Sequence, residues 1–150
     1  MADTLQFELV SPERLLLSEA VSMVVVPGTE GNFGVLPGHA LLISTVRPGI
    51  IDVYDEGQVS ERIFVSGGFA EVTPERCTVL ADEAMPLSSL DRGAIEGELR
   101  TLESTVAGYK DQAARASGAD RETALVGLAS SERHLAVARA KLAALGAAAH

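Results

Sequence analysis

Cysteine and histidine are scarce in this 150-residue sequence, and their scarcity excludes several kinds of site. The single cysteine, Cys77, cannot form a disulfide within the chain or supply a cysteine-based zinc site. The three histidines, His39, His134 and His150, lie far apart and lack the spacing of metal ligands. We therefore expect no metal site and no cofactor.

Long hydrophobic runs are also missing. No segment approaches the roughly 18 consecutive apolar residues that a membrane-spanning helix needs. Residues 1–8 lack the basic start and the apolar run of a secretion signal. We therefore expect any association with a membrane to go through a partner protein.

Basic residues are few as well, since 12 Lys and Arg stand against 21 Asp and Glu, for a formal net charge of −9. A phosphate backbone would repel such a surface, so nucleic acid is not an expected partner. Apolar residues make up 47% of the chain, which is enough to build a globular core.

The composition changes near residue 87 and indicates two domains. Residues 1–93 contain 6 alanines, whereas the shorter stretch 94–150 contains 16. Charge divides at the same place, because residues 1–87 hold 13 acidic and 4 basic side chains and residues 88–150 hold 8 of each. Alanine favours helix, whereas Val, Ile and Thr fit a pleated sheet. We expect a β domain at residues 1–86 and an α-helical domain at residues 87–150.

The first domain has the pattern of short strands. Leu5, Phe7 and Leu9 alternate with polar residues, which is the period of a half-buried strand. Turn sequences such as Pro27-Gly28 and Pro48-Gly49 separate seven further strand-like runs, at 15–17, 21–26, 40–46, 49–54, 59–66, 69–73 and 77–81. Such a series, with no helix between the strands, predicts an antiparallel sandwich or barrel.

The second domain has helical periodicity. Apolar residues recur every three or four positions along the first predicted helix, at Ile95, Leu99, Leu102, Val106, Tyr109 and Ala113. Residues 88–91 resemble a helix start, and residues 117–120 a stop followed by a new cap. The second helix carries a leucine stripe at Leu125, Leu128, Leu135, Leu142 and Leu145. Joined by so short a turn, the two helices should lie antiparallel.

Four glycines, Gly93, Gly97, Gly108 and Gly127, fall inside these predicted helices. Each costs about 1 kcal/mol of helix stability relative to alanine. Two interpretations stay open, namely neutral drift in helices that tertiary contacts stabilise, or an arm that can leave its packed position.

No catalytic constellation is evident. The glycine-rich segment 27–40 leads into a strand, has no lysine and carries Glu30, so it predicts tight turns and an exposed binding tip, not a phosphate-binding loop. A triad of His39, Ser66 and Asp82 is conceivable, but Ser66 lacks the strand–turn–helix context of a hydrolase nucleophile. We expect Cys77 to be a small core residue and no residue to be catalytic.

Several segments in a fixed order resemble the epsilon subunit of the bacterial rotary F-type ATP synthase. They are LQFELVSPER at residues 5–14, VVVPGTEG at 24–31, GVLPGHA at 34–40, RPG at 47–49, VSGGFAEV at 65–72 and TVLADEA at 78–84. The resemblance implies a mainly β, α+β protein, with a ten-stranded antiparallel β-sandwich followed by a two-helix antiparallel hairpin.

The resemblance also implies a non-catalytic central-stalk subunit that couples rotation of the c-subunit ring to ATP synthesis in the alpha-beta head. Its implied partners are the gamma subunit, the c ring and the head, at the cytoplasmic face of the bacterial inner membrane. Glu30 and Gly31 match the family's tip that faces the c ring, and His39 matches a position near gamma. A free-standing adaptor built from the same two domains is the alternative, and a small hydrolase using His39 and Ser66 is a third hypothesis.

In this family the hairpin can fold against the sandwich or extend toward the head and restrain ATP hydrolysis. Arg133, Arg139 and Lys141 are either an ordinary solvated helix face or cations that contact the head. Some members bind ATP through a Leu-Asp pair followed by Arg-Ala. Here Leu90-Asp91 is present, but the positions expected to hold Arg-Ala, two residues later, hold Ala94 and Ile95, so we assign no nucleotide-binding residues.

Overall fold

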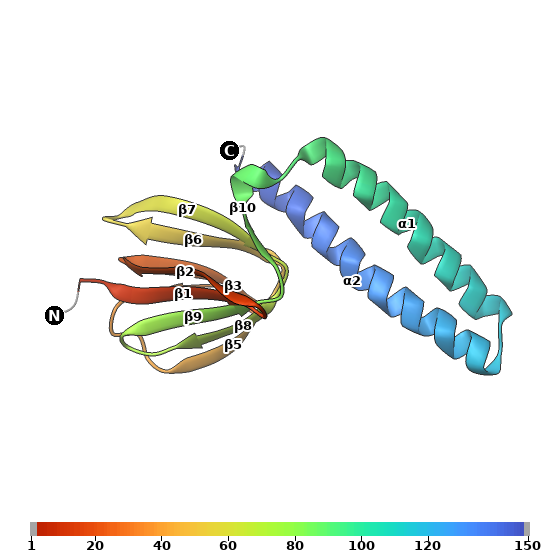
Figure 1. The fold of residues 1–150 in the computed structure, drawn as a ribbon, viewed down its shortest axis with the longest axis horizontal. Helices are drawn as coiled ribbons and strands as arrows, with labels where there is room; N and C mark the ends of the chain where they lie inside the picture. Colours follow the sequence, from red (N-terminus) through yellow and green to blue (C-terminus); the bar gives the residue numbers. More distant parts are fainter. Residues whose placement is uncertain (1–2, 149–150) are drawn as a thin grey trace. The chain divides into compact units, whose positions relative to one another are not determined.

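The computed structural model describes residues 3–148 and confirms the expected fold, with ten strands followed by two long helices (Figure 1). The strands are β1 (Leu5–Ser11), β2 (Arg14–Val21), β3 (Met23–Gly28), β4 (Gly31–Val35), β5 (Leu42–Val46), β6 (Gly49–Asp55), β7 (Gln58–Val65), β8 (Gly68–Val72), β9 (Arg76–Ala81) and β10 (Ala84–Pro86). A one-turn 3-10 helix, η1 (Leu87–Ser89), precedes α1 (Arg92–Arg115) and α2 (Gly118–Ala148).

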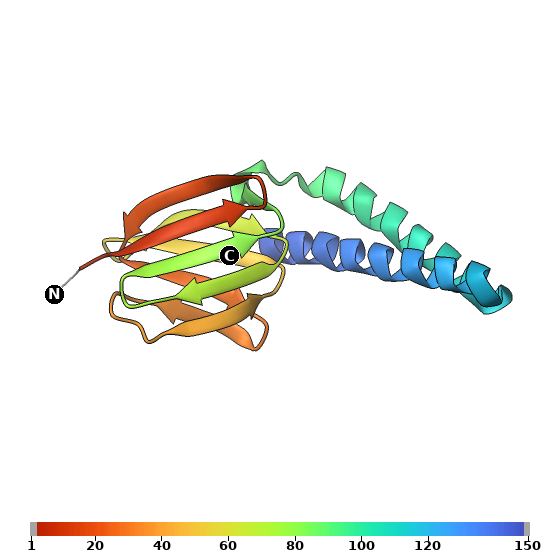
Figure 2. The same cartoon turned by 60° about the horizontal axis from the view of Figure 1, so that its bottom comes forward.

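Nine of the strands follow one hydrogen-bonded path, β10-β7-β6-β3-β5-β8-β9-β1-β2, and β4 pairs with β3. The path turns a corner at β3, which pairs with β6 through Met23–Val25 but with β5 only where Gly28 faces Val46. This corner separates two layers, so that β6 and β7 lie across from β5, β8 and β9 (Figure 1). In the second view, the red strands of the N-terminal hairpin lie beside the green strands β8 and β9 (Figure 2).

One strand pair departs from the expected antiparallel order. β1 runs parallel to β9, with Phe7 opposite Cys77, whereas the other ladders of the described chain are antiparallel. The two strands are far apart in the chain, so no hairpin turn fixes their relative direction. The packing of the sandwich sets it instead.

The sandwich core follows the predicted alternation. Leu5, Phe7 and Leu9 are buried, and they face inward with Val79 and Cys77 from the neighbouring strand. Burial raises the pKa of the Cys77 thiol to about 12, so this thiol stays protonated at neutral pH. The prediction that Cys77 is a small core residue is confirmed.

Two strands were missing from the expectations based on alternation. β4 lies inside the glycine-rich segment, where Gly31 and Gly34 hide the period-two pattern. β10 has only three residues and pairs with the end of β7. Each strand forms by pairing with a neighbouring strand, β4 with β3 and β10 with β7, and a local sequence pattern does not reveal such pairing.

The hairpin has its own seam. Asp91 caps α1 by accepting a hydrogen bond from the Gly93 amide (3.2 Å), so the helix starts later than residues 88–91 predicted. Ile95, Val106 and Ala113 are buried along α1, as expected. Leu125 on α2 is 43% exposed, however, and the predicted leucine stripe is wrong there. The buried positions of α2 are mostly small residues, at Ala124, Ser131, Leu135, Ala138 and Ala144.

The chain divides into two compact units, Met1–Ser89 and Leu90–His150, so η1 belongs with the sandwich. Ser89 Oγ donates to the carbonyl oxygen of Pro86 (2.8 Å) and closes that turn. The two helices of the second unit lie side by side and antiparallel in both views (Figures 1 and 2). Neither helix, over its described residues, is long and apolar enough to cross a bilayer.

Candidate partner-binding surfaces

An apolar row crosses the outer face of the sheet β5-β8-β9-β1-β2. The strand register aligns four apolar residues of neighbouring strands, Phe69, Leu80, Val10 and Leu15, and the polar Thr45 on β5 ends this row. Phe69, Leu80 and Leu15 are 57%, 52% and 56% exposed. Their neighbours on the same strands point into the core, so the alternation of each strand forces these side chains outward. Ile43, two residues before Thr45, is also largely exposed.

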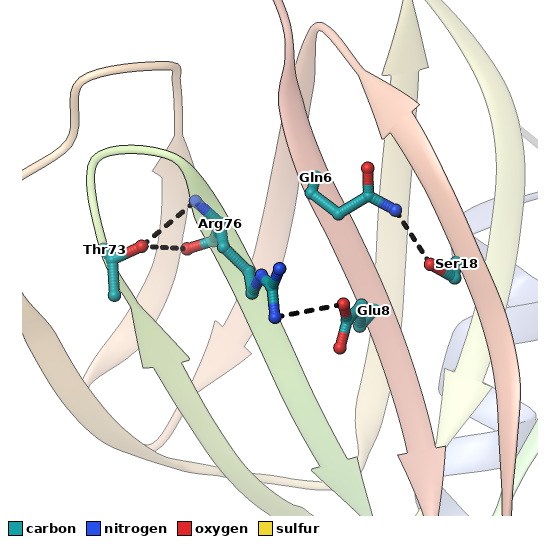
Figure 3. A network of polar contacts seen from close by, with 5 residues as sticks. All are labelled: Gln6, Glu8, Ser18, Thr73 and Arg76. Atoms are coloured by element: carbon teal, nitrogen blue, oxygen red, sulfur yellow. Dashed lines mark hydrogen bonds and ion pairs between the residues drawn. The ribbon is translucent and has the colours of Figure 1, made fainter.

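The other end of this face is polar. The Arg76 guanidinium forms an ion pair with Glu8 across the parallel β1–β9 ladder (3.3 Å), and Gln6 Nε2 donates to Ser18 Oγ (2.8 Å). Thr73 Oγ1 and the Arg76 backbone are hydrogen bonded at the β8–β9 turn (Figure 3). The face therefore has an apolar half and a charged, hydrogen-bonded half.

His39 lies in the connection between β4 and β5, close to the β8–β9 turn. Its backbone N–H donates to the Leu36 carbonyl oxygen (3.1 Å), and the Gly38 N–H donates to the Pro74 carbonyl oxygen (2.7 Å). Nδ1 of the half-buried ring donates to the carbonyl oxygen of Ala40 (2.7 Å). These bonds hold the imidazole in place, and Leu41, two residues further along the same connection, is largely exposed.

Glu30 and Gly31 lie at the tip of the β3–β4 hairpin. Gly28 pairs with Gly31, so that Thr29 and Glu30 form a two-residue turn. Gly31 has a φ of +136°, which side-chain-bearing residues rarely adopt. A β-carbon on Gly28 would lie 2.8 Å from the Gly31 carbonyl oxygen, so both glycines are needed for so narrow a turn. Glu30 is exposed and, among residues 3–148, has no ion-pair partner.

Arg47 reaches this turn, a role that the sequence pattern did not predict. Its Nη1 donates to the Gly28 carbonyl oxygen (2.5 Å) and its Nη2 to Asn32 Oδ1 (2.6 Å). The sequence signal was present, since the Arg-Pro-Gly segment at residues 47–49 already formed part of the family resemblance. Which acceptors this side chain would reach could not be inferred without the fold.

The three cations predicted on the second helix do not share a face. Successive helical residues turn by about 100°, so Arg139 and Lys141 point to nearly opposite sides of α2. Arg139 lines an open groove of about 390 Å³ between the helices, together with Glu103, Lys110 and Glu132. Arg133 is exposed.

The residues of the hypothetical triad are not brought together. Within the described part of the chain, no side-chain hydrogen bond links His39, Ser66 and Asp82; Ser66 and Asp82 instead pair through their backbones with Glu83 and Gly67. No group of three or more His, Cys, Asp or Glu residues among residues 3–148 is arranged to hold a metal ion.

Comparisons with known proteins fit this architecture. The family profile "ATP synthase, Delta/Epsilon chain, beta-sandwich domain" matches residues 4–87. The ATP synthase epsilon chain of Rhodospirillum rubrum is 57% identical over 119 residues, which is 79% of this chain and 89% of that protein. The epsilon chain of Rhodospirillum centenum is 64% identical over 107 residues, covering 68% of this chain and 73% of that one.

The fold also occurs in a solved assembly. A chain in the cryo-EM structure of the Euglena gracilis mitochondrial ATP synthase (OSCP/F1/c-ring, rotational state 1) matches with a TM-score of 0.69 and 24% identity. The match covers all of this chain and 84% of that one. These findings confirm the resemblance drawn from the sequence, together with the expectation of a non-catalytic subunit. The chain belongs to the family of ATP synthase epsilon chains.

Proposed function

We propose that the apolar row on the outer sheet face binds the gamma subunit and that the β3–β4 tip contacts the c ring. In this role the chain is a central-stalk subunit that couples ring rotation to ATP synthesis in the alpha-beta head. The observation that carries the proposal is that the exposed Phe69, Leu80 and Leu15 and the half-buried Val10 lie in register across the four strands β8, β9, β1 and β2.

Such a row is suited to a lasting protein contact. Burying apolar surface yields roughly 25 cal/mol per Å², and contiguous exposed apolar side chains commonly mark protein interfaces. The sheet beneath the row is rigid, because its inner face is a packed core. His39 and Leu41 lie at the β4–β5 connection of the same sandwich, which supports His39 as a further gamma contact.

The tip offers a different kind of contact. Glu30 and Gly31 stand at the end of a narrow, hydrogen-bonded hairpin, and the Glu30 carboxylate is exposed. An exposed carboxylate favours a polar or basic loop as its partner. This supports the tip as the point that meets the c ring.

We assign the hairpin the role of a regulatory arm. It forms its own compact unit with its own buried seam, and its Arg133, Arg139 and Lys141 side chains are the candidates for contact with the head. These three side chains point to different sides of α2, so they would contact the head on different faces of the helix. We place the assembled protein at the cytoplasmic face of the bacterial inner membrane, held there through the complex, in line with its bacterial relatives.

A binding experiment tests the gamma contact. Serine at both Phe69 and Leu80 should weaken binding of purified gamma at least tenfold, because the row loses its apolar centre while the core is untouched. Val126→Ser, which changes an exposed apolar residue on α2, is the matched control. Unchanged gamma affinity in the Phe69/Leu80 double variant would count against the proposal and would favour the adaptor alternative.

A further inference from the structure

We propose that Arg47 is the positioning residue of the β3–β4 tip, whose guanidinium bridges the two strands at the base of the turn and fixes the direction of Thr29 and Glu30. The inference rests on the proposed ring contact and adds to it a residue that does not itself touch the ring.

The bridge joins both strands of the hairpin. Nη1 donates to the carbonyl oxygen of Gly28, the last residue of β3, over 2.5 Å. Nη2 donates to Oδ1 of Asn32, the second residue of β4, over 2.6 Å. One planar side chain therefore spans the whole two-residue turn, and each bond is assisted by the guanidinium charge.

The backbone around Arg47 anchors the same turn. The Arg47 N–H donates to the Pro27 carbonyl oxygen (2.8 Å), and the Thr29 N–H donates to the Thr45 carbonyl oxygen (3.1 Å). The tip is thus tied to the end of β5 by two backbone bonds and two side-chain bonds. Without the side-chain pair, the β3–β4 ladder and the two backbone bonds would remain, but those two bonds reach only the β3 side of the hairpin, through Pro27 and Thr29.

Arg47 does not form an ion pair within the described residues 3–148. No carboxylate in this range lies at ion-pair distance from it, and the two side-chain hydrogen bonds of Arg47 both go to the β3–β4 hairpin. A lysine has a single ammonium and cannot present the same planar fork to two acceptors. Val26, Val35 and Val46, near the corner, are buried as part of the hydrophobic core. Loss of Arg47 should therefore loosen the tip and leave the sandwich folded.

Amide hydrogen exchange in the full-length chain tests the positioning directly. In Arg47→Met the Thr29 amide should exchange at least tenfold faster than in the unchanged protein, while the amides of β6 and β7 keep their rates. Arg47→Lys should give an intermediate rate. Arg62→Met is the matched control, since Arg62 pairs with Asp52 on β6 and does not reach the tip. An unchanged Thr29 rate in Arg47→Met, or an equal acceleration throughout the sandwich, would overturn the proposal.

Coupling in the reconstituted synthase gives the second measurement. Arg47→Met should bind gamma normally but pump fewer protons per ATP hydrolysed, as should a variant with Thr29 and Glu30 deleted. If the deletion uncouples the enzyme and Arg47→Met does not, the positioning role is wrong. If neither uncouples it while the Thr29 amide is loosened in Arg47→Met, the ring contact is wrong and the positioning of the tip stands.

Discussion

Tyr109 on α1 packs its ring directly against the backbone of Gly127 on α2. A β-carbon at position 127 would lie 2.4 Å from Cε1 of that ring, well inside contact distance. Close packing against Tyr109 therefore explains why residue 127 is a glycine, which the helical pattern alone did not explain. Gly108, in contrast, has open space where its β-carbon would be, as expected for a glycine without a packing role.

Gly127→Ala should destabilise the hairpin. Overpacking typically destabilises the fold by about 1–3 kcal/mol. The higher helix propensity of alanine offsets about 1 kcal/mol of this loss. Gly108→Ala is the matched control and should stabilise the helix by about 1 kcal/mol. Thermal unfolding of the full-length variants followed by circular dichroism measures both. A stabilising Gly127→Ala would show that the ring moves aside freely.

Gly68→Ala should disrupt the pairing of β8 with β9 at the start of β8. Gly68 has a φ of +146°, and its β-carbon would lie 1.9 Å from the Leu80 carbonyl oxygen of the paired strand. Strain of about 3 kcal/mol or more is expected, because a backbone atom cannot step aside as a side chain does. Gly57→Ala, with a φ of +81° and no close neighbour, should cost only about 1–2 kcal/mol. Urea unfolding compares the two, and equal losses would contradict the argument.

Stability should depend on pH through Glu19. Burial raises the pKa of Glu19 above its ordinary 4.5, and a hydrogen bond to Glu61 and the negative charges of Glu61 and Asp55 raise it further. Glu61 Oε2 is buried without a hydrogen-bond donor in the described structure, and a proton on Glu19 would supply one.

Because the raised pKa favours the protonated carboxyl in the fold, its stabilising effect is complete below pH 4.5 and is lost as the pH rises through the folded value. Glu19→Gln should therefore raise the melting temperature at pH 7, and the difference should shrink toward pH 4. Calorimetry across this range is the measurement, with the exposed Glu13→Gln as the control. A difference that grows on acidification would refute the assignment.

Removing the hairpin should test its regulatory role. The cut belongs after Ser89, since η1 is part of the sandwich unit. The truncated chain should still assemble and support coupled proton pumping, while the ATPase rate of the complex should rise at least twofold if the arm restrains hydrolysis. A change below twofold, under about 0.4 kcal/mol, would mean that this arm does not inhibit. Loss of pumping would show that it is structural.

Local pattern predicted the elements whose side chains carry their own period. The alternation at Leu5, Phe7 and Leu9 and the spacing of Ile95, Val106 and Ala113 survive in the fold, because each set faces one core. The leucine stripe on α2 failed at Leu125, since close helix packing favoured Ala124 and Ser131 at the seam. Glu30 and Gly31 at a tip could be expected from turn residues and from the family resemblance, whereas the Arg47 bridge could not.

The sequence by itself determined two domains, a β-sandwich and a helical hairpin, and membership of the epsilon chain family, because composition, period and motif order are properties of the chain. Only the tertiary structure decided which side chains meet. The parallel β1–β9 ladder aligns Val10 with Leu80 into an apolar row, and the corner between β3 and β5 brings Arg47 to Gly28 and Asn32. These neighbours are distant in sequence, and register and sheet closure, not local propensity, bring them together.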